Sequence, residues 1–63
     1  MFRTARITFF ARDTFCNRRY CEDLRVWDDE TNRDPHRLNK AVRAALVRAG
    51  FKMPGVIRWR FID

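Results

Sequence analysis

The residues of this chain that could do chemistry are two cysteines, one histidine, a group of carboxylates and many arginines. Cys16 and Cys21 are separated by four residues, and His36 is the single histidine. A zinc site takes four ligands and usually includes two closely spaced cysteines, so we expect no metal site. The cysteines are expected to be reduced, one packed and one partly exposed. A disulfide between them is the alternative, and it would need an oxidising compartment.

The same inventory does not favour catalysis. No glycine-rich oxyanion loop accompanies His36 and the cysteines, and the two glycines, Gly50 and Gly55, cannot form a phosphate-cradling loop. Carboxylates gather at residues 28–32, an expected solvated turn where burial would not raise a pKa for acid–base work. The sequence therefore predicts a protein without enzymatic activity or a cofactor. The alternative is a small ribonuclease that acts through arginine charge and His36.

Arginine dominates the charge of the chain. The net charge is +6 with a pI near 10.7, and twelve of the fourteen basic residues are arginine. Residues 1–21 carry a net charge of +4, residues 22–34 carry −4, and residues 35–63 carry +6. A basic surface favours polyanion binding, and the planar guanidinium suits phosphate. Two alternatives remain: the arginines reflect the coding bias of a GC-rich genome, or the acidic run pairs with them or with a basic partner.

Length and composition predict one small globular domain over residues 1–63. The chain is 46% hydrophobic with nine aromatic residues, which is too apolar for a disordered segment. A domain of this size buries little surface, so a homodimer or a docked partner is a reasonable expectation. Arginines interrupt the N-terminal apolar run, and no stretch could span a bilayer. We therefore expect a cytoplasmic protein that does not enter a membrane.

Residues 34–50 carry the signals of one amphipathic helix. Asp34 can cap the first turn, Pro35 suits the first helical position, and Gly50 can close the last turn. At 100° per residue, the predicted buried stripe is Leu38, Val42, Ala45, Leu46 and Ala49. The opposite stripe is Arg37, Lys40, Ala44 and Arg48. Its basic residues, Arg37, Lys40 and Arg48, form a predicted secondary basic face that could contact phosphate. The simpler interpretation is a charged helix face exposed to solvent.

Three strands are predicted around this helix, over residues 3–11, 20–28 and 56–62. The inward side chains of the first are Ala5, Ile7, Phe9 and Ala11. Those of the second are Tyr20, Leu24 and Val26, with Cys21, Asp23, Arg25 and Trp27 outward. Those of the third are Ile57, Trp59 and Phe61. A loop at residues 13–19 joins the first two strands, a turn at 52–55 precedes the third, and Phe51 is expected to fold back onto the helix end or the sheet.

Connectivity then predicts the topology. The first two strands form an antiparallel hairpin, and the strand–helix–strand connection makes the second and third strands point the same way. If the third strand pairs on the free side of the first, the order is 2-1-3. The expected fold is α+β with ββαβ connectivity, in which the helix covers one face of a three-stranded antiparallel sheet and leaves the other face open.

The open face of this sheet is the predicted binding platform. Its side chains are expected to include Arg6, Phe10, Arg12, Arg25, Trp27, Arg58 and Arg60. Aromatic rings can stack bases and guanidiniums can neutralise phosphates, as a single-stranded nucleic acid or RNA requires. The layout is similar to the sheet surface of RNA-recognition modules, without the aromatic-rich motifs of those families. The main hypothesis is therefore a non-enzymatic nucleic-acid-binding domain.

The rival hypothesis is that the same face binds a protein. Tryptophan, phenylalanine and arginine are also enriched at protein interfaces, with Phe10 and Trp27 as anchors. In size and composition the chain is similar to small accessory proteins of bacteriophages and other mobile elements, many of which bind and block one host macromolecule. That resemblance implies a stoichiometric inhibitor or regulator of a host protein.

Overall fold

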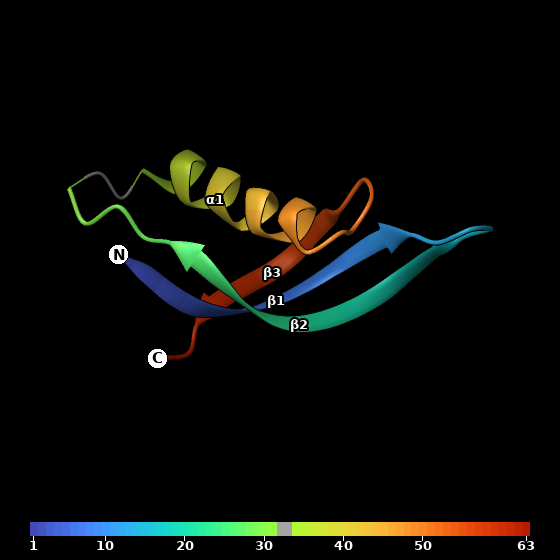
Figure 1. Cartoon of the computed structure of the whole chain (residues 1–63), viewed down its shortest axis with the longest axis horizontal. Helices are drawn as coiled ribbons and strands as arrows, with labels where there is room; N and C mark the ends of the chain where they lie inside the picture. The colour runs from blue at the N-terminus through green and yellow to red at the C-terminus, as the bar shows by residue number, and fades with distance from the viewer. Residues whose placement is uncertain (32–33) are drawn as a thin grey trace.

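The computed structural model describes residues 1–31 and 34–63, which form three strands and one helix. The strands β1 (Phe2–Arg12) and β2 (Asn17–Trp27) are followed by the helix α1 (Pro35–Arg48) and the strand β3 (Gly55–Phe61). Neighbouring strands are antiparallel, their order is β2-β1-β3, and α1 lies against one face of the sheet (Figure 1). The expected α+β fold with ββαβ connectivity is confirmed.

The hairpin formed by β1 and β2 is longer than predicted at its turn. The two strands pair without a break as far as Arg12 opposite Asn17, so the loop shrinks to residues 13–16. The second strand therefore begins three residues earlier than the expected position 20. Backbone hydrogen bonds between the two strands hold these last pairs. The residues that β2 contributes to them, 17–19, are all polar, so no alternation of apolar and polar residues predicts a strand there.

Both ends of α1 carry the capping groups that the sequence predicts. The carboxylate of Asp34 accepts a hydrogen bond from the backbone N–H of His36 at 3.0 Å, and a proline occupies the first helical position. At the other end Gly50 has a φ of 96°, and the N–H of Phe51 donates to the carbonyl of Leu46 at 3.1 Å. This closing hydrogen bond is typical of a helix that ends in a left-handed glycine.

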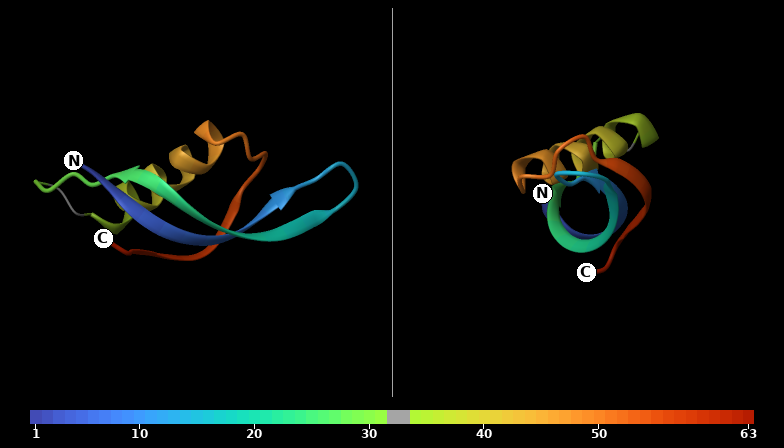
Figure 2. Two further views of the ribbon diagram at one scale, coloured as in Figure 1. Left: turned by 60° about the horizontal axis from the view of Figure 1, so that its bottom comes forward. Right: turned by 90° about the vertical axis from the view of Figure 1, so that its right-hand side faces the viewer.

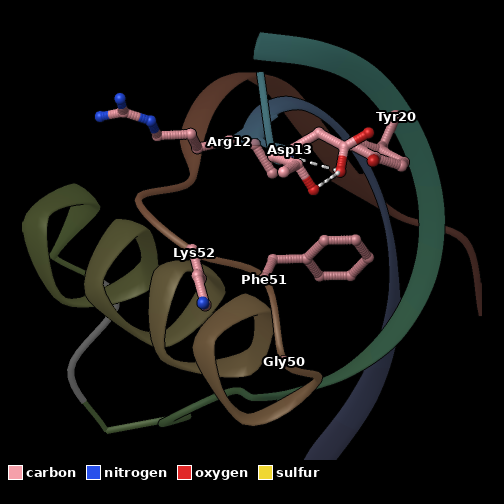
Figure 3. A pocket seen from close by; sticks show the side chains of 8 residues that line it. Arg12, Asp13, Tyr20, Gly50, Phe51 and Lys52 are labelled. Carbon is pink, nitrogen blue, oxygen red and sulfur yellow. Dashed lines mark hydrogen bonds between the residues drawn. The ribbon is translucent and has the colours of Figure 1, made fainter. Parts of the chain in front are cut away.

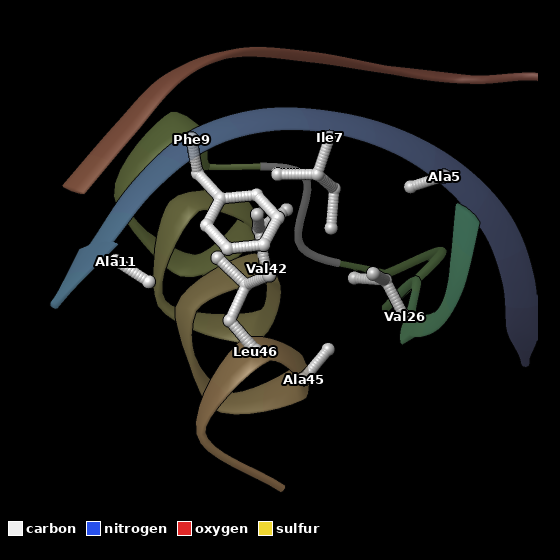
Figure 4. Close-up of a cluster of buried hydrophobic side chains, with 8 residues drawn as sticks. All are labelled: Ala5, Ile7, Phe9, Ala11, Val26, Val42, Ala45 and Leu46. Carbon is white, nitrogen blue, oxygen red and sulfur yellow. The ribbon is translucent and has the colours of Figure 1, made fainter. Parts of the chain in front are cut away.

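The core lies between α1 and alternate residues of β1. Phe9 has the largest fully buried side chain and lies close to Leu46 and Val42 from the helix (Figure 4). The buried core consists of Ala5, Ile7, Phe9, Ala11, Val26, Val42, Ala45 and Leu46. The ring of Phe51 lies 4.8 Å from the ring of Phe9, centroid to centroid, so this residue folds back onto the sheet as predicted.

Two residues predicted to face the core, Ile57 and Ala49, are exposed. Consecutive residues of β1 pair with Arg58 and then with Val56, so Ile57 is an extra residue that forms a β-bulge. The bulge breaks the alternation of β3 and leaves the Ile57 side chain 46% exposed. Ala49 is the C-terminal cap of α1 and lies beyond the turns of the helix that pack on the sheet.

The predicted solvated turn at residues 28–32 is wrong at its first residue. Asp28 is fully buried at the end of β2, where its carboxylate accepts a hydrogen bond from the guanidinium of Arg3 at 3.3 Å. A charged partner on the neighbouring strand makes this burial tolerable. Arg3 also lies over the ring of Phe61, 4.1 Å from its centroid. Asn32, at the end of the predicted turn, lies outside the described residues.

The molecule is elongated and its hairpin is strongly twisted. Its extents are 41 × 20 × 18 Å. The turn of the hairpin projects beyond α1 and β3 at one end, while both ends of the chain lie at the other (Figure 1; Figure 2). In the part of the chain that the structure describes, no helix is long and apolar enough to cross a membrane.

Phe9 and Phe10 are neighbours on opposite faces of β1, so they test the assignment of the core. A phenylalanine-to-alanine change in a core costs about 3–5 kcal/mol, and a domain of this length has a free energy of unfolding of about 6 kcal/mol. We expect Phe9→Ala to lower the urea midpoint, followed by circular dichroism, by about half or more. Phe10→Ala should leave it nearly unchanged, and equal losses would contradict the assignment.

Candidate nucleic-acid interface

The face of the sheet opposite the core carries six arginines and one aspartate. Residues paired directly across an antiparallel ladder share a face, and side chains alternate along each strand. The register places on this face Phe2, Thr4, Arg6, Thr8, Phe10 and Arg12 from β1, Asn17, Arg19, Cys21, Asp23, Arg25 and Trp27 from β2, and Arg58 and Arg60 from β3. We call it the open face. It includes all seven predicted platform residues, and each of them is exposed.

Three arginines meet at the centre of the open face. Arg6 lies directly opposite Arg60, and Arg58 is the next residue of β3 on the same face. Directly opposed side chains begin about 5 Å apart at their Cβ atoms. The three arginines border one hollow of ≈ 350 Å³, whose other lining residues are Thr8, Cys21 and Trp59. We call Arg6, Arg58 and Arg60 the arginine cluster.

Asp23 is the carboxylate of the open face, and it is paired with Arg6. The Nε and Nη2 atoms of Arg6 donate to its two carboxylate oxygens at 3.0 and 3.1 Å. This hydrogen bonding lowers the pKa of Asp23 and raises the pKa of Arg6. Among the described residues, Arg58 and Arg60 form no ion pair. Two of the three charges in the arginine cluster are therefore not neutralised by a nearby carboxylate.

Trp27 lies at the end of the open face, where the hairpin passes beside α1. Its ring is 50% exposed and packs edge-on against Phe2, with centroids 5.2 Å apart. It borders a hollow of ≈ 420 Å³ together with Arg37 and Lys40, the rest of the lining being Asp29, Leu38 and Ala41. The structure thus groups Trp27 with two cations of the predicted helix face rather than with the arginine cluster. The third helix cation, Arg48, lies in the last turn of α1, outside this hollow.

Arg25 and Phe10 lie on either side of the arginine cluster along the sheet. Arg25 reaches the backbone carbonyl of Phe2, to which its Nη2 atom donates at 3.4 Å. Phe10 is 45% exposed and has the small residue Gly55 opposite it on β3. The missing side chain at Gly55 leaves one flank of the Phe10 ring uncovered by β3.

Arg12 has different surroundings from the arginine cluster. Its backbone N–H donates to the carbonyl of Lys52 at 3.1 Å, which ties the end of β1 to the segment after α1. Its side chain borders a separate hollow of ≈ 500 Å³ with Asp13, Phe51 and Lys52 (Figure 3). In this view the Phe51 ring points inward toward Tyr20, whereas the Arg12 guanidinium points away from both rings. Arg12 therefore belongs to the hairpin end of the open face.

Three features of this surface were not anticipated from the sequence. Phe2 extends the first strand by one residue and joins Trp27. Asp23 is predicted to face outward, but the residue opposite it depends on the register of the hairpin, which is set by the length of the loop between β1 and β2. The predicted loop, residues 13–19, is too long; the observed loop, residues 13–16, places Asp23 opposite Arg6. Phe15 lies in that loop, where periodicity gives no signal.

Both cysteines are free and exposed, so the expectation that one of them is packed is wrong. Cys16 lies in the hairpin turn, and Cys21 lies on the open face, which no second layer covers. The Sγ atom of Cys21 is 3.9 Å from the hydroxyl of Thr8. Across residues 1–31 and 34–63, no group of three or more His, Cys, Asp or Glu side chains is arranged to hold a metal ion.

Comparison with models of protein families, with curated proteins and with solved structures finds no match to this chain. A function is therefore inferred from the fold and from the chemistry of the open face.

The ion pair between Arg6 and Asp23 can be tested by titrating the carboxyl group of Asp23. Because hydrogen bonding from Arg6 lowers the pKa of Asp23, the pair stabilises the fold above the ordinary carboxyl pKa of about 3.9. That contribution is lost as the pH falls through the lowered value. In an NMR titration of side-chain carboxyls, Arg6→Ala should raise the midpoint of Asp23. An unchanged Asp23 midpoint would show that the pair does not form in solution.

Proposed function

We propose that this protein is a non-enzymatic nucleic-acid-binding domain that holds single-stranded nucleic acid or RNA across its open face. The observation that carries the proposal is the arginine cluster. Arg6 and Arg60 occupy the same rung of the sheet with Arg58 beside them, and the carboxylate of Asp23 pairs with Arg6 alone. The fold thus concentrates positive charge at the centre of its uncovered face.

This arrangement has a physical cost that an anion removes. Like charges directly opposite each other on neighbouring strands destabilise a sheet. A phosphate group between Arg6 and Arg60 would replace that repulsion with charge-assisted hydrogen bonds, and guanidiniums can make these in pairs. Thr8 adds a hydroxyl to the lining of the same hollow. A chain of phosphates is therefore a better partner for this surface than a neutral ligand.

Exposed aromatic rings on both sides of the cluster supply the second element of a single-strand platform. Phe2 of β1 and its partner Trp27 of β2 lie at one end of the open face, and Phe10 lies toward the other end. Phe2 and Phe10 are eight residues apart, which is about 27 Å along a strand. Bases can stack on such rings while the arginines between them contact the backbone. The path is long enough for several nucleotides.

Salt dependence tests the arginine cluster directly. We expect the affinity of fluorescein-labelled oligouridine, measured by fluorescence anisotropy, to fall linearly on a log–log plot against salt concentration. Arg60→Ala should weaken binding and make the slope shallower by about 0.7, the contribution of one phosphate contact to a single strand. Arg48→Ala removes the same charge from α1, away from the open face. Equal effects of the two variants would contradict a specific role for the arginine cluster.

A gain of affinity is a sharper test of the same surface. Asp23→Asn removes the carboxylate that holds Arg6 and so frees a third guanidinium for phosphate. Binding of oligouridine should become tighter, with a steeper salt slope. Glu22→Gln is the matched control, because it makes the same change of charge at the adjacent residue, which points to the other face of β2. If both variants gain equally, net charge rather than the open face controls binding.

A protein target is the alternative that the exposed Phe2–Trp27 pair favours. Aromatic rings beside a hollow lined by Leu38 and Ala41 resemble the anchors of protein interfaces. This alternative predicts one host protein retained by the tagged chain after nuclease treatment. It also predicts that Trp27→Ala abolishes that complex, whereas Arg60→Ala does not. Nucleic acid that is lost on nuclease treatment or in high salt would support the primary proposal instead.

A further inference from the structure

The turn of the hairpin places one aromatic ring at the far end of the molecule. Phe15 is 96% exposed, the highest value among the large hydrophobic side chains of the described residues. The turn projects beyond α1 and β3, at the opposite end from both chain ends (Figure 1; Figure 2). A ring this exposed contributes nothing to the core, and keeping it in water is unfavourable. Its position therefore points to a role in binding.

The turn that carries Phe15 is held together by Asp13. The backbone N–H of Asp13 donates to the carbonyl of Cys16 at 2.8 Å, and its carboxylate accepts the N–H of Thr14 at 2.7 Å. The other carboxylate oxygen lies 3.2 Å from Nε of Arg18. These contacts give the turn a defined shape, so the ring is presented at the tip at little further cost in conformational entropy.

Arginines lie behind the ring on both strands of the hairpin. Arg12 ends β1, while Arg18 and Arg19 lie near the start of β2, and all three are exposed. The tip therefore combines one stacking surface with cations on its two sides. The end of a nucleic-acid duplex exposes the flat face of its last base pair with a phosphate backbone on either side, so a ring with cations beside it is complementary in charge to a duplex end.

We propose that the hairpin turn recognises the junction between a single strand and a duplex. Phe15 stacks on the terminal base pair, and Arg12 and Arg19 contact the backbones that flank it. The inference rests on the proposed function, because the single strand that continues from the junction occupies the open face. To stack, an aromatic ring needs a base whose flat face is not already covered by another base, and the last pair of a duplex has such a face. A pair inside the duplex would first have to be unstacked.

The test compares three labelled RNAs with the wild-type protein: an oligouridine, a blunt stem-loop, and the same stem-loop carrying that oligouridine as a tail. We expect the tailed stem to bind about tenfold more tightly than the oligouridine, which is the contribution of one stacked base. The blunt stem should bind more weakly than either. A 2-aminopurine in the terminal pair should change its fluorescence when the protein binds.

Variants of Phe15 distinguish recognition of the junction from affinity for the single strand. Phe15→Ala should abolish both the tenfold preference and the fluorescence change, while oligouridine affinity stays the same. Phe15→Trp should restore both. Val47→Ala, which shortens another exposed apolar side chain on α1, is the matched control and should change neither.

The outcomes distinguish the two proposals. If oligouridine binds and the tailed stem binds no better, the junction inference is wrong and the proposed function stands. If the preference survives in Phe15→Ala, the ring is not its source and the inference is also wrong. If the wild-type protein binds none of the three RNAs, the proposed function itself fails.

Discussion

The burial of alternate β1 side chains beneath α1 is the interaction on which the rest of the structure depends. β1 is the central strand, and Phe9 lies in the middle of the only core that the described residues form. Because side chains alternate along a strand, turning Phe9 inward also turns Arg6 and Phe10 outward. A single helix cannot cover both faces of the sheet. The same contact that stabilises the domain therefore creates the open face.

The distribution of charge around this sheet is uneven in a way that net charge does not reveal. Arg3 is used internally, since it pairs with the buried Asp28 and lies over an aromatic ring. Arg6 is paired with Asp23. Part of the acidic run predicted from the sequence thus compensates arginines within the fold, which is one of the two expectations for it. Arg58 and Arg60, at the centre of the open face, form no ion pair among the described residues.

The sequence predicted the architecture well because its signals are local. The caps of α1 and the alternation of β1 need no knowledge of the rest of the chain, and connectivity gives the observed strand order once β3 pairs on the free side of β1. The errors arose where a long-range contact decides. The bulge at Ile57 depends on how β3 meets β1, and the burial of Asp28 depends on Arg3, which is distant in sequence. The composition of the candidate site was predictable, but its division into separate hollows was not, because twist and register set it.

Position within the sheet also affects how well each part of the surface can bind. Arg6 stands on a strand with hydrogen-bonded neighbours on both sides, and Arg60 stands opposite it in the same ladder. Backbones held in this way leave mainly side-chain freedom to be lost on binding, which favours affinity. The hairpin turn lies outside the ladder and depends on the contacts of Asp13 instead. A rigid centre would suit the proposed sequence-independent contacts to phosphates, while a separately braced turn would present its ring to the proposed junction without ordering the rest of the sheet.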